Sequence, residues 1–280
     1  VSWSTTYNPL QQYRLKLVFV DIDIKTLNYD LKSLESSITK KTKMILIVNL
    51  LGNNNDFDQI IRIANSKKVI VIEDNCESMG SKYNGKYSGT FGLIGTFSSF
   101  FSHHISSMEG GYCLTDDYVL YNYMKSLRAH GWTRDVDTTS FNNLSVKSKF
   151  FKSFDFILPG YNLRPLEIEA AIANVQLDKL NRIIQVRREN AKYFVKKSIN
   201  HPLFFVQEEI GQSSWFGFSI VLKEKFKKYR DQLAHYLISM NIECRPIVTG
   251  NFTRHSVIRY FDYKIHNKLI NANYIHDHGL

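Results

Sequence analysis

The sequence predicts an α/β protein: a large part built on a mainly parallel sheet, followed by a smaller α+β part. Three short, continuous apolar runs, at 17–20, 44–48 and 69–72, are typical of strands buried on both faces of a parallel sheet. Helix-like segments separate these runs, and alternation of strand and helix is the signature of an α/β fold.

Two helices are predicted between the strands. Segment 30–38 carries Leu31, Leu34 and Ile38 at helical spacing, and segment 56–66 has the same pattern. Their apolar stripes are therefore expected to cover the sheet.

The pattern changes in the second half of the chain. Pro165 lies just inside the start of a long amphipathic segment, which predicts a helix that connects two parts. After it, 213–223 and 242–248 are interpreted as strands and 229–241 as a helix.

These patterns predict two domains. We expect a large cofactor-binding domain at 1–184, including the connecting helix, and a smaller C-terminal domain at 185–280. The chain begins VSWSTTYNPL, without Met, and we expect a fragment whose large domain is incomplete at its N-terminus.

Charge and composition narrow the classes of partner. The net charge is +10, but lysines and arginines are spread along the chain, so we interpret them as solvated surface rather than a nucleic-acid groove. A phosphorylated substrate would suit the same charge. Neither a membrane-spanning run nor a signal segment is recognisable, which makes a cytoplasmic location the default expectation.

The cysteines also agree with a cytoplasmic location. Cys76, Cys113 and Cys244 are widely separated, without a CxxC or zinc pattern, so we expect free thiols in a reducing compartment. An iron–sulfur cluster normally takes four thiolates, which three cysteines do not supply.

Two polar residues, Asp74 and Ser98, are candidates for binding a ligand. Asp74 follows the run at 69–72, separated from it only by Glu73, and ligands of parallel sheets bind at the carboxyl ends of strands. It would suit a cation or a protonated ring nitrogen, and a helix N-cap is the alternative. Ser98, in GTFSSF, would suit a phosphate, and an ordinary surface loop is the alternative.

The adjacent residues His103 and His104 admit three interpretations. They are metal ligands with Glu109, ordinary polar or core residues, or a catalytic base. No standard zinc spacing is present, and we expect no metal site. The Gly-Gly pair that follows predicts a tight turn into a strand, YCLT.

Taken together, the motifs resemble a known family. A strand ending in Glu-Asp, then GTFS, the histidine loop, EGG, a strand ending TDD, LRAHGW and PGYNLRPLEIEAAIANVQL follow in order. This order is similar to the DegT/DnrJ/EryC1/StrS sugar aminotransferases and covers nearly the whole chain. The resemblance implies a pyridoxal-phosphate (PLP)-dependent transferase of fold type I, like aspartate aminotransferase, and a homodimer with a shared active site.

The sequence departs from the family at one position. Where the family has a lysine that binds the cofactor covalently, this chain has His103. That exchange resembles the sugar 3-dehydratase branch. Imidazole forms no stable Schiff base, so pyridoxamine phosphate (PMP) would be held non-covalently, and a neutral imidazole can accept a proton.

The resemblance implies a reaction and its partners. The reaction is removal of the C3 hydroxyl from a nucleotide-linked 4-keto-6-deoxyhexose, in 3,6-dideoxysugar and O-antigen biosynthesis. L-Glutamate would be the amino donor, and no iron–sulfur cluster is expected.

Site roles follow by matching positions. Asp74 would pair with the pyridine nitrogen, Glu77 would contact the ring-hydroxyl region, and Ser98 would bind the phosphate. Trp3 would stack on the ring, with a buried or interface tryptophan as the alternative. Asn162 would reach a phosphate of the neighbouring subunit.

Three residues are less defined. His130 resembles a second active-site histidine, with a structural role as the alternative, and His104 is interpreted as supporting. Arg245 would bind a carboxylate or the nucleotide, or would simply lie on a surface strand.

Three other functions stay open from the sequence. They are an ordinary PLP-dependent sugar aminotransferase, a truncated non-catalytic relative that binds a sugar nucleotide, and a basic nucleic-acid binder.

Overall fold

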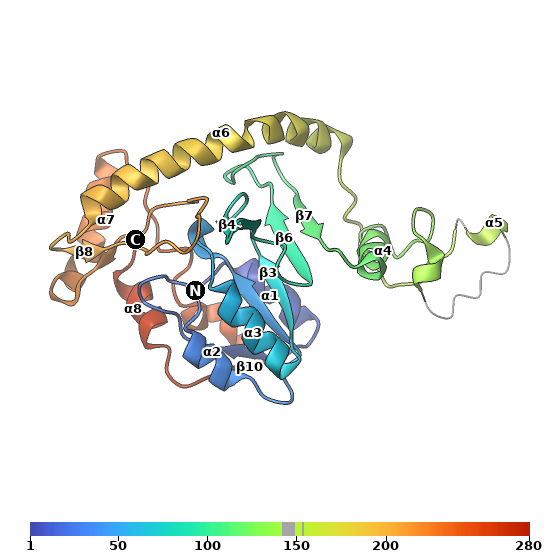
Figure 1. The fold of residues 1–280 in the computed structure, drawn as a ribbon, viewed down its shortest axis with the longest axis horizontal. Coiled ribbons are helices and arrows are strands. Elements are labelled where there is room, and N and C mark those ends of the chain that lie inside the picture. The colour runs from blue at the N-terminus through green and yellow to red at the C-terminus, as the bar shows by residue number, and fades with distance from the viewer. Residues whose placement is uncertain (142–148, 153) are drawn as a thin grey trace.

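A four-stranded sheet forms the centre of the computed structural model, which describes residues 1–141, 149–152 and 154–280 (Figure 1). Its strand order is β2-β3-β6-β7; the first three strands are parallel and β7 is antiparallel. The mainly parallel sheet predicted from the sequence is therefore confirmed. The described strands are β1 (Leu17–Phe19), β2 (Met44–Val48), β3 (Ile70–Asp74), β4 (Lys82–Tyr83), β5 (Lys86–Tyr87), β6 (Ile94–Ser98), β7 (Gly111–Leu114), β8 (Phe204–Phe205), β9 (Val221–Leu222) and β10 (Tyr263–Ile265).

Helices lie around this sheet. The described α-helices are α1 (Ser4–Gln12), α2 (Leu31–Ser37), α3 (Phe57–Lys67), α4 (Tyr118–Leu127), α5 (Lys149–Lys152), α6 (Glu167–Ser198), α7 (Arg230–Ser239) and α8 (Ile270–His278). The described 3₁₀ turns are η1 (Leu50–Gly52), η2 (Thr138–Ser140), η3 (Glu224–Tyr229), η4 (Phe252–Arg254) and η5 (Ser256–Tyr260).

Helices α2 and α3 match the two helices predicted from the sequence. Asp30 and Asp56 cap them, accepting hydrogen bonds from Ser33 N and Gln59 N at 2.7 and 3.1 Å. Helix α3 lies on the face of the sheet seen in Figure 1. Its Phe57 packs with Ile45 and other β2 and β3 residues in a buried cluster. Burial alternates along β2 and β3, so these strands are less buried than predicted.

A second core joins segments far apart in the chain. Leu50 and Leu51 pack with Val221, Ile247 and Ile275. Strand β1 was predicted to lie in the main sheet, but it pairs in parallel with β10 instead. The apolar run predicted the strand and could not predict its partner, which lies far along the chain.

The two strands predicted in the C-terminal part are mostly absent. Only Val221–Leu222 of 213–223 is a strand, and 242–248 contains none. Trp215 and Val248 have φ of 51° and 52°, outside the extended region that a strand requires. The helix predicted at 229–241 is confirmed as α7.

Helix α6 is the long connecting helix, confirmed just beyond Pro165, and it spans the top of the molecule from β7 to α7 (Figure 1). It also continues across the predicted domain boundary between residues 184 and 185. That boundary stays a prediction. The described parts of 118–166, which include α4 and α5, extend away from the sheet as an arm (Figure 1).

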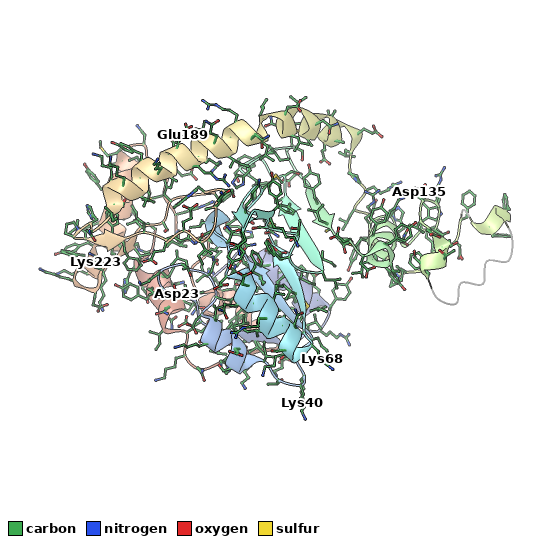
Figure 2. The ribbon with its side chains drawn as sticks, viewed as in Figure 1. Asp23, Lys40, Lys68, Asp135, Glu189 and Lys223 are labelled. Carbon is green, nitrogen blue, oxygen red and sulfur yellow. The ribbon has the colours of Figure 1, made fainter. Side chains whose placement is uncertain are left out.

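Charged side chains point outward around the molecule. Figure 2 shows Lys40 and Lys68 at one edge and Lys223 at another, which fits a dispersed positive charge. Within the described ranges, none of the helices combines the length and apolar character needed to cross a bilayer.

Candidate active site

Asp74 and Ser98 lie at the same edge of the sheet. Asp74 ends β3 and is paired with Thr96 of the parallel neighbour β6, whose last residue is Ser98. The carboxyl ends of these strands, where parallel sheets bind ligands, therefore carry both residues that the sequence predicts for the cofactor.

The Asp74 carboxylate is fixed by two donors. The Thr6 hydroxyl of α1 donates to Oδ2 at 2.7 Å, and the Cys76 amide donates to Oδ1 at 3.1 Å. A turn rather than a helix follows Asp74, so the helix-cap alternative is wrong. Burial, and then the charge of Asp74, raises the pKa of the Cys76 thiol above its ordinary range, which keeps that thiol protonated.

Glu77 lies beside this carboxylate. Its Oε2 accepts a hydrogen bond from Leu51 N at 2.7 Å. Burial raises the pKa of Glu77 to about 7; the Leu51 amide and the charge of Arg245 oppose the shift, and Asp74 adds to it. Glu77 therefore changes charge close to neutral pH.

His103 lies in the loop after β6, held by a 2.9 Å bond from its amide to Phe100 O. Its ring packs against Phe216, with centroids 5.0 Å apart. Its Nδ1 atom is buried and has no hydrogen-bond partner among the described residues. The nearby Phe100 carbonyl raises the pKa of the ring, because it favours the protonated form. Burial lowers the pKa of His103, so the imidazole is neutral at pH 7.

The charged groups that act on His103 are one carboxylate and two guanidiniums. Asp74 raises its pKa, and Arg245 and Arg187 lower it. No lysine is among them in the described part of the chain. His103 thus stands in a polar site that lacks the amine needed for a Schiff base.

His104 has a different environment. It is buried, and its Nε2 donates to Ser214 O at 3.0 Å, which fixes the tautomer because a carbonyl only accepts. Burial lowers its pKa to about 4. The described residues contain no group of three His, Cys, Asp or Glu side chains able to hold a metal ion.

The polar groups at this edge fit a planar, anionic cofactor such as PLP. The Asp74 carboxylate suits a protonated ring nitrogen, and the His103 Nδ1 atom has no hydrogen-bond partner among the described residues. The Ser98 oxygen accepts from Phe100 N at 3.2 Å, which leaves its hydroxyl hydrogen to donate to a phosphate. Trp3, at the start of α1, is 52% exposed, so a ring face is accessible.

Asn162 and His130 lie together on the arm instead. Asn162 forms a bridge with Ala129, and the His130 amide donates to Tyr161 O at 2.7 Å. In the described ranges no contact joins them to Asp74 or His103. The catalytic role of His130 and the phosphate contact of Asn162 stay predictions.

Sequence reasoning missed the residues that hold this site in place. Thr6 reaches Asp74 across 68 positions, and Phe216 packs on a histidine 113 positions earlier in the sequence. Arg187 also lies within electrostatic range of His103. Neither local pattern nor spacing carries a signal for such contacts.

The sheet, the carboxylate at its edge and the loop after β6 define a class of protein. The profile of the DegT/DnrJ/EryC1/StrS aminotransferase family matches residues 1–280, so the chain belongs to this family, as the motifs predicted. Proteins named GDP-4-keto-6-deoxy-D-mannose 3-dehydratase, from Escherichia coli O55:H7 and Yersinia pseudotuberculosis, are each 55% identical to it. They match 100% of this chain, which spans 73% and 72% of their lengths.

A solved structure of a protein with the same name is also similar to this chain. The E. coli enzyme of that name with bound hydrated PLP superposes with a TM-score of 0.96, at 54% identity over 100% of this chain and 72% of its own. The predicted fold class, that of PLP-dependent transferases, is confirmed.

Proposed function

We propose that this protein removes the C3 hydroxyl from GDP-4-keto-6-deoxy-D-mannose, with PMP as cofactor. The observation that carries the proposal is the half-buried, neutral His103, on which the charge of Asp74 acts and, among the described residues, that of no lysine. The relatives at 55% identity are named for this reaction. The nucleotide and the hexose, which the sequence left open, are taken from those relatives.

The cofactor supplies an amine for the 4-keto group and a ring that accepts electron density. Asp74 holds the proton on the ring nitrogen through a charge-assisted hydrogen bond, and Thr6 keeps its carboxylate in place. Ser98 binds the phosphate. Trp3, whose side chain is 52% exposed, would cover one face of the ring and exclude water from it.

His103 moves the protons of the reaction. As a neutral imidazole it accepts a proton from the cofactor carbon that bears the amine, and its conjugate acid donates to the departing C3 hydroxyl. A lysine at this position would instead deliver a proton to sugar C4, which gives an amino sugar. Replacement of lysine by histidine therefore favours deoxygenation.

The overall reaction balances with glutamate as the reductant. The sugar exchanges its C3 hydroxyl for hydrogen, glutamate becomes 2-oxoglutarate, and the glutamate nitrogen leaves as ammonia. A solved 3-dehydratase structure, 54% identical, contains PLP and glutamate trapped together, which supports glutamate as the donor.

A substitution pair in a relative lies on a Ser-His step like the one that contains His103. One solved 3-dehydratase structure, 53% identical, carries a His→Lys replacement directly after a Ser→Asn replacement. The only Ser-His step in this chain is Ser102-His103.

Three further features belong to the proposal. The arm would complete the site of a second copy in a homodimer, with Asn162 on the partner's phosphate. The division at 184 and 185 would separate cofactor-binding and C-terminal domains. A cytoplasmic location fits three cysteines that form no disulfide.

The test is product analysis with PMP, glutamate and GDP-4-keto-6-deoxymannose, followed by mass spectrometry. The parent chain should yield a sugar without its C3 oxygen, and His103→Lys should lose that product. His235→Lys, which puts a lysine on the exposed face of α7, is the matched control and should behave like the parent. A 4-amino sugar from the parent chain would refute the proposal in favour of an aminotransferase.

A further inference from the structure

Both adjacent histidines contact one loop, residues 213–216. His104 donates from Nε2 to the Ser214 carbonyl at 3.0 Å. The His103 ring packs on the Phe216 ring at 5.0 Å, with an angle of 47° between the planes. One histidine therefore fixes the backbone of this loop, and the other is covered by its side chain.

The loop rests on the turn η1. Ser214 N donates to Gly52 O at 3.1 Å, and Phe216 N donates to Leu51 O at 2.9 Å. Gly52 has φ of 87°, and a Cβ there would lie 2.7 Å from Trp215 N, so only glycine allows this approach. The Leu51 amide holds Glu77, so η1 connects the loop to the carboxylates of the site.

Helix α6 holds the loop from the other side. Arg187 donates from Nη1 to the carbonyls of Trp215 and Phe216, both at 2.9 Å. Trp215 has the left-handed φ of 51°, which an L-residue keeps only when its surroundings hold it. Arg187 therefore fixes Trp215 and Phe216, whereas His104 alone among these side chains holds Ser214.

We propose that His104 is a positioning residue: its bond to the Ser214 carbonyl sets where the Phe216 ring lies against His103. The contact itself does not depend on the reaction. Its catalytic consequence rests on the proposed function, in which His103 moves the protons.

The consequence is a change in the pH at which His103 becomes protonated. Phe216 is one wall of the buried environment that disfavours the imidazolium, and Asp74, Arg245 and Arg187 are the charged groups that also face it. Leu51 and Arg187 hold the backbone of Phe216, but its ring also lies 5.9 Å from the His104 ring. Loss of the His104 side chain removes that neighbour together with the bond to Ser214, so the Phe216 ring shifts and water reaches His103. The pKa of His103 then rises toward its ordinary value of 6.5.

The test is a titration of the His103 imidazole by NMR in cofactor-free protein labelled at histidine. The His103 signal is identified by its absence in His103→Asn. His104→Ala should raise the pH at which His103 titrates, and His104→Gln, which restores an amide donor, should return it toward the parent value. This readout needs no substrate and no bound cofactor.

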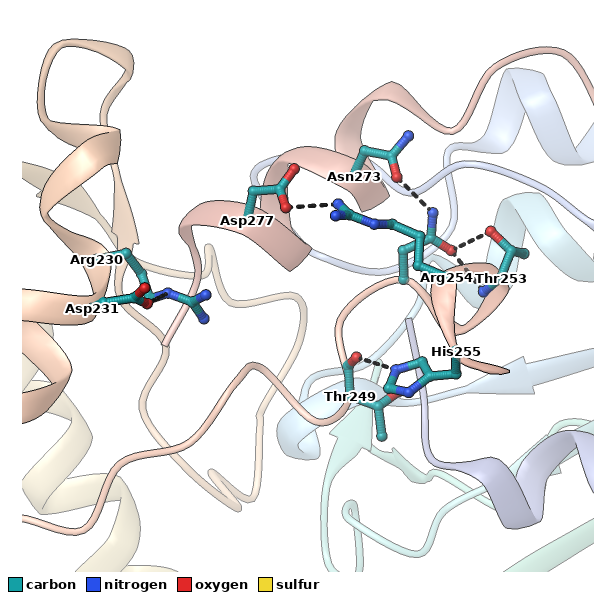
Figure 3. Close-up of polar contacts among 9 residues, drawn as sticks. Arg230, Asp231, Thr249, Thr253, Arg254, His255, Asn273 and Asp277 are labelled. Atoms are coloured by element: carbon teal, nitrogen blue, oxygen red, sulfur yellow. Dashed lines mark hydrogen bonds and ion pairs between the residues drawn. The ribbon is translucent and has the colours of Figure 1, made fainter. Parts of the chain in front are cut away.

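His255→Ala is the matched control. His255 also bonds a backbone carbonyl through Nε2, that of Thr249 at 2.9 Å, as Figure 3 shows. Its loss removes a comparable bond away from the loop. The titration of His103 should not change.

Phe216→Leu covers the case in which His104→Ala does not fold. It keeps an apolar side chain and removes the ring, and should raise the His103 titration in the same direction. An unchanged titration in folded His104→Ala, or in Phe216→Leu, would overturn the proposal.

The reaction offers an independent readout. Because only the neutral imidazole accepts a proton, the acid limb of kcat/KM should move to higher pH in His104→Ala, with a loss near pH 6 that shrinks near pH 8. A uniform loss at all pH values would indicate a merely structural role and overturn the positioning role. If the parent makes an amino sugar, the proposed function fails while the titration still tests the contact.

Discussion

Two regions of this molecule that share the predicted active site differ sharply in burial. At the sheet edge, Glu77 and His104 are bonded to backbone groups and His103 is covered by Phe216. On the arm, large apolar side chains face water. The exposed fractions of four of them are 74% for Phe150, 61% for Phe154, 59% for Phe156 and 68% for Leu163.

The difference indicates which part of the predicted active site one chain can build without a second copy. The sheet edge orients its own carboxylate and imidazole through contacts within the chain. The arm exposes apolar surface of the kind that marks a protein interface, and it carries Asn162 and His130. We therefore expect the chemistry to depend on the sheet edge and its completion to depend on a second copy.

The largest effect is expected at His103. His103→Asn removes the proton acceptor but keeps a polar side chain, so kcat should fall about 10²- to 10⁴-fold, the usual contribution of a general acid–base. Steady-state kinetics with the GDP-sugar measure this. A loss of less than tenfold would show that another group moves the proton.

Asp74→Asn should have the next largest effect. The amide cannot hold a proton on the ring nitrogen, and loss of a buried charge partner costs about 3 kcal/mol, or about 100-fold in kcat/KM. Asn keeps the shape that Thr6 contacts, so the fold should survive. Thr6→Val, which removes only the hydroxyl, should have a smaller effect of the same kind.

Glu77 gives the sheet edge a pH-dependent stability. Its pKa is about 7 in the folded chain and 4.5 ordinarily, so the folded state holds the proton more tightly. The free energy of unfolding of cofactor-free protein should therefore decline as pH rises from 4.5 through about 7. Glu77→Gln should reduce this decline by about 3 kcal/mol in urea titrations. An identical decline in both proteins would contradict the assigned pKa.

The smallest effect is expected on the arm. Asn162→Ala should weaken cofactor binding about tenfold, because one hydrogen bond to a phosphate is lost. Equilibrium titration with PMP measures this. Unchanged affinity would remove Asn162 from the site.

Mixing variants sharpens the comparison between the two regions. If Asn162 acts on the partner's site, co-refolded His103→Asn and Asn162→Ala chains form mixed dimers with one intact site. Activity at limiting PMP should then recover to roughly a quarter of the parent value. No recovery above the separate variants would show that each chain builds its site alone.

Local patterns predicted much of this molecule. Apolar runs gave β2 and β3, caps and spacing gave α3, and Asp74 was found at the sheet edge because it ends an apolar strand. The substitution at His103 was visible because the flanking motifs resemble a family with lysine there.

The failures were long-range or conformational. Segment 213–223 alternates like a strand, but the loop is held by Arg187 and Gly52, and Trp215 takes a left-handed φ. No local pattern encodes those partners. For the same reason the role of His104 was visible only once Ser214 lay beside it.

The most direct test of the central claim follows the cofactor nitrogen through one turnover. Protein loaded with ¹⁵N-labelled PMP would be mixed with GDP-4-keto-6-deoxymannose in the absence of glutamate, and both ammonia and sugar would be analysed. The proposed role of His103 predicts labelled ammonia in solution and a sugar that lacks both its C3 oxygen and the label. A sugar that retains the C3 hydroxyl and carries ¹⁵N at C4 would contradict it.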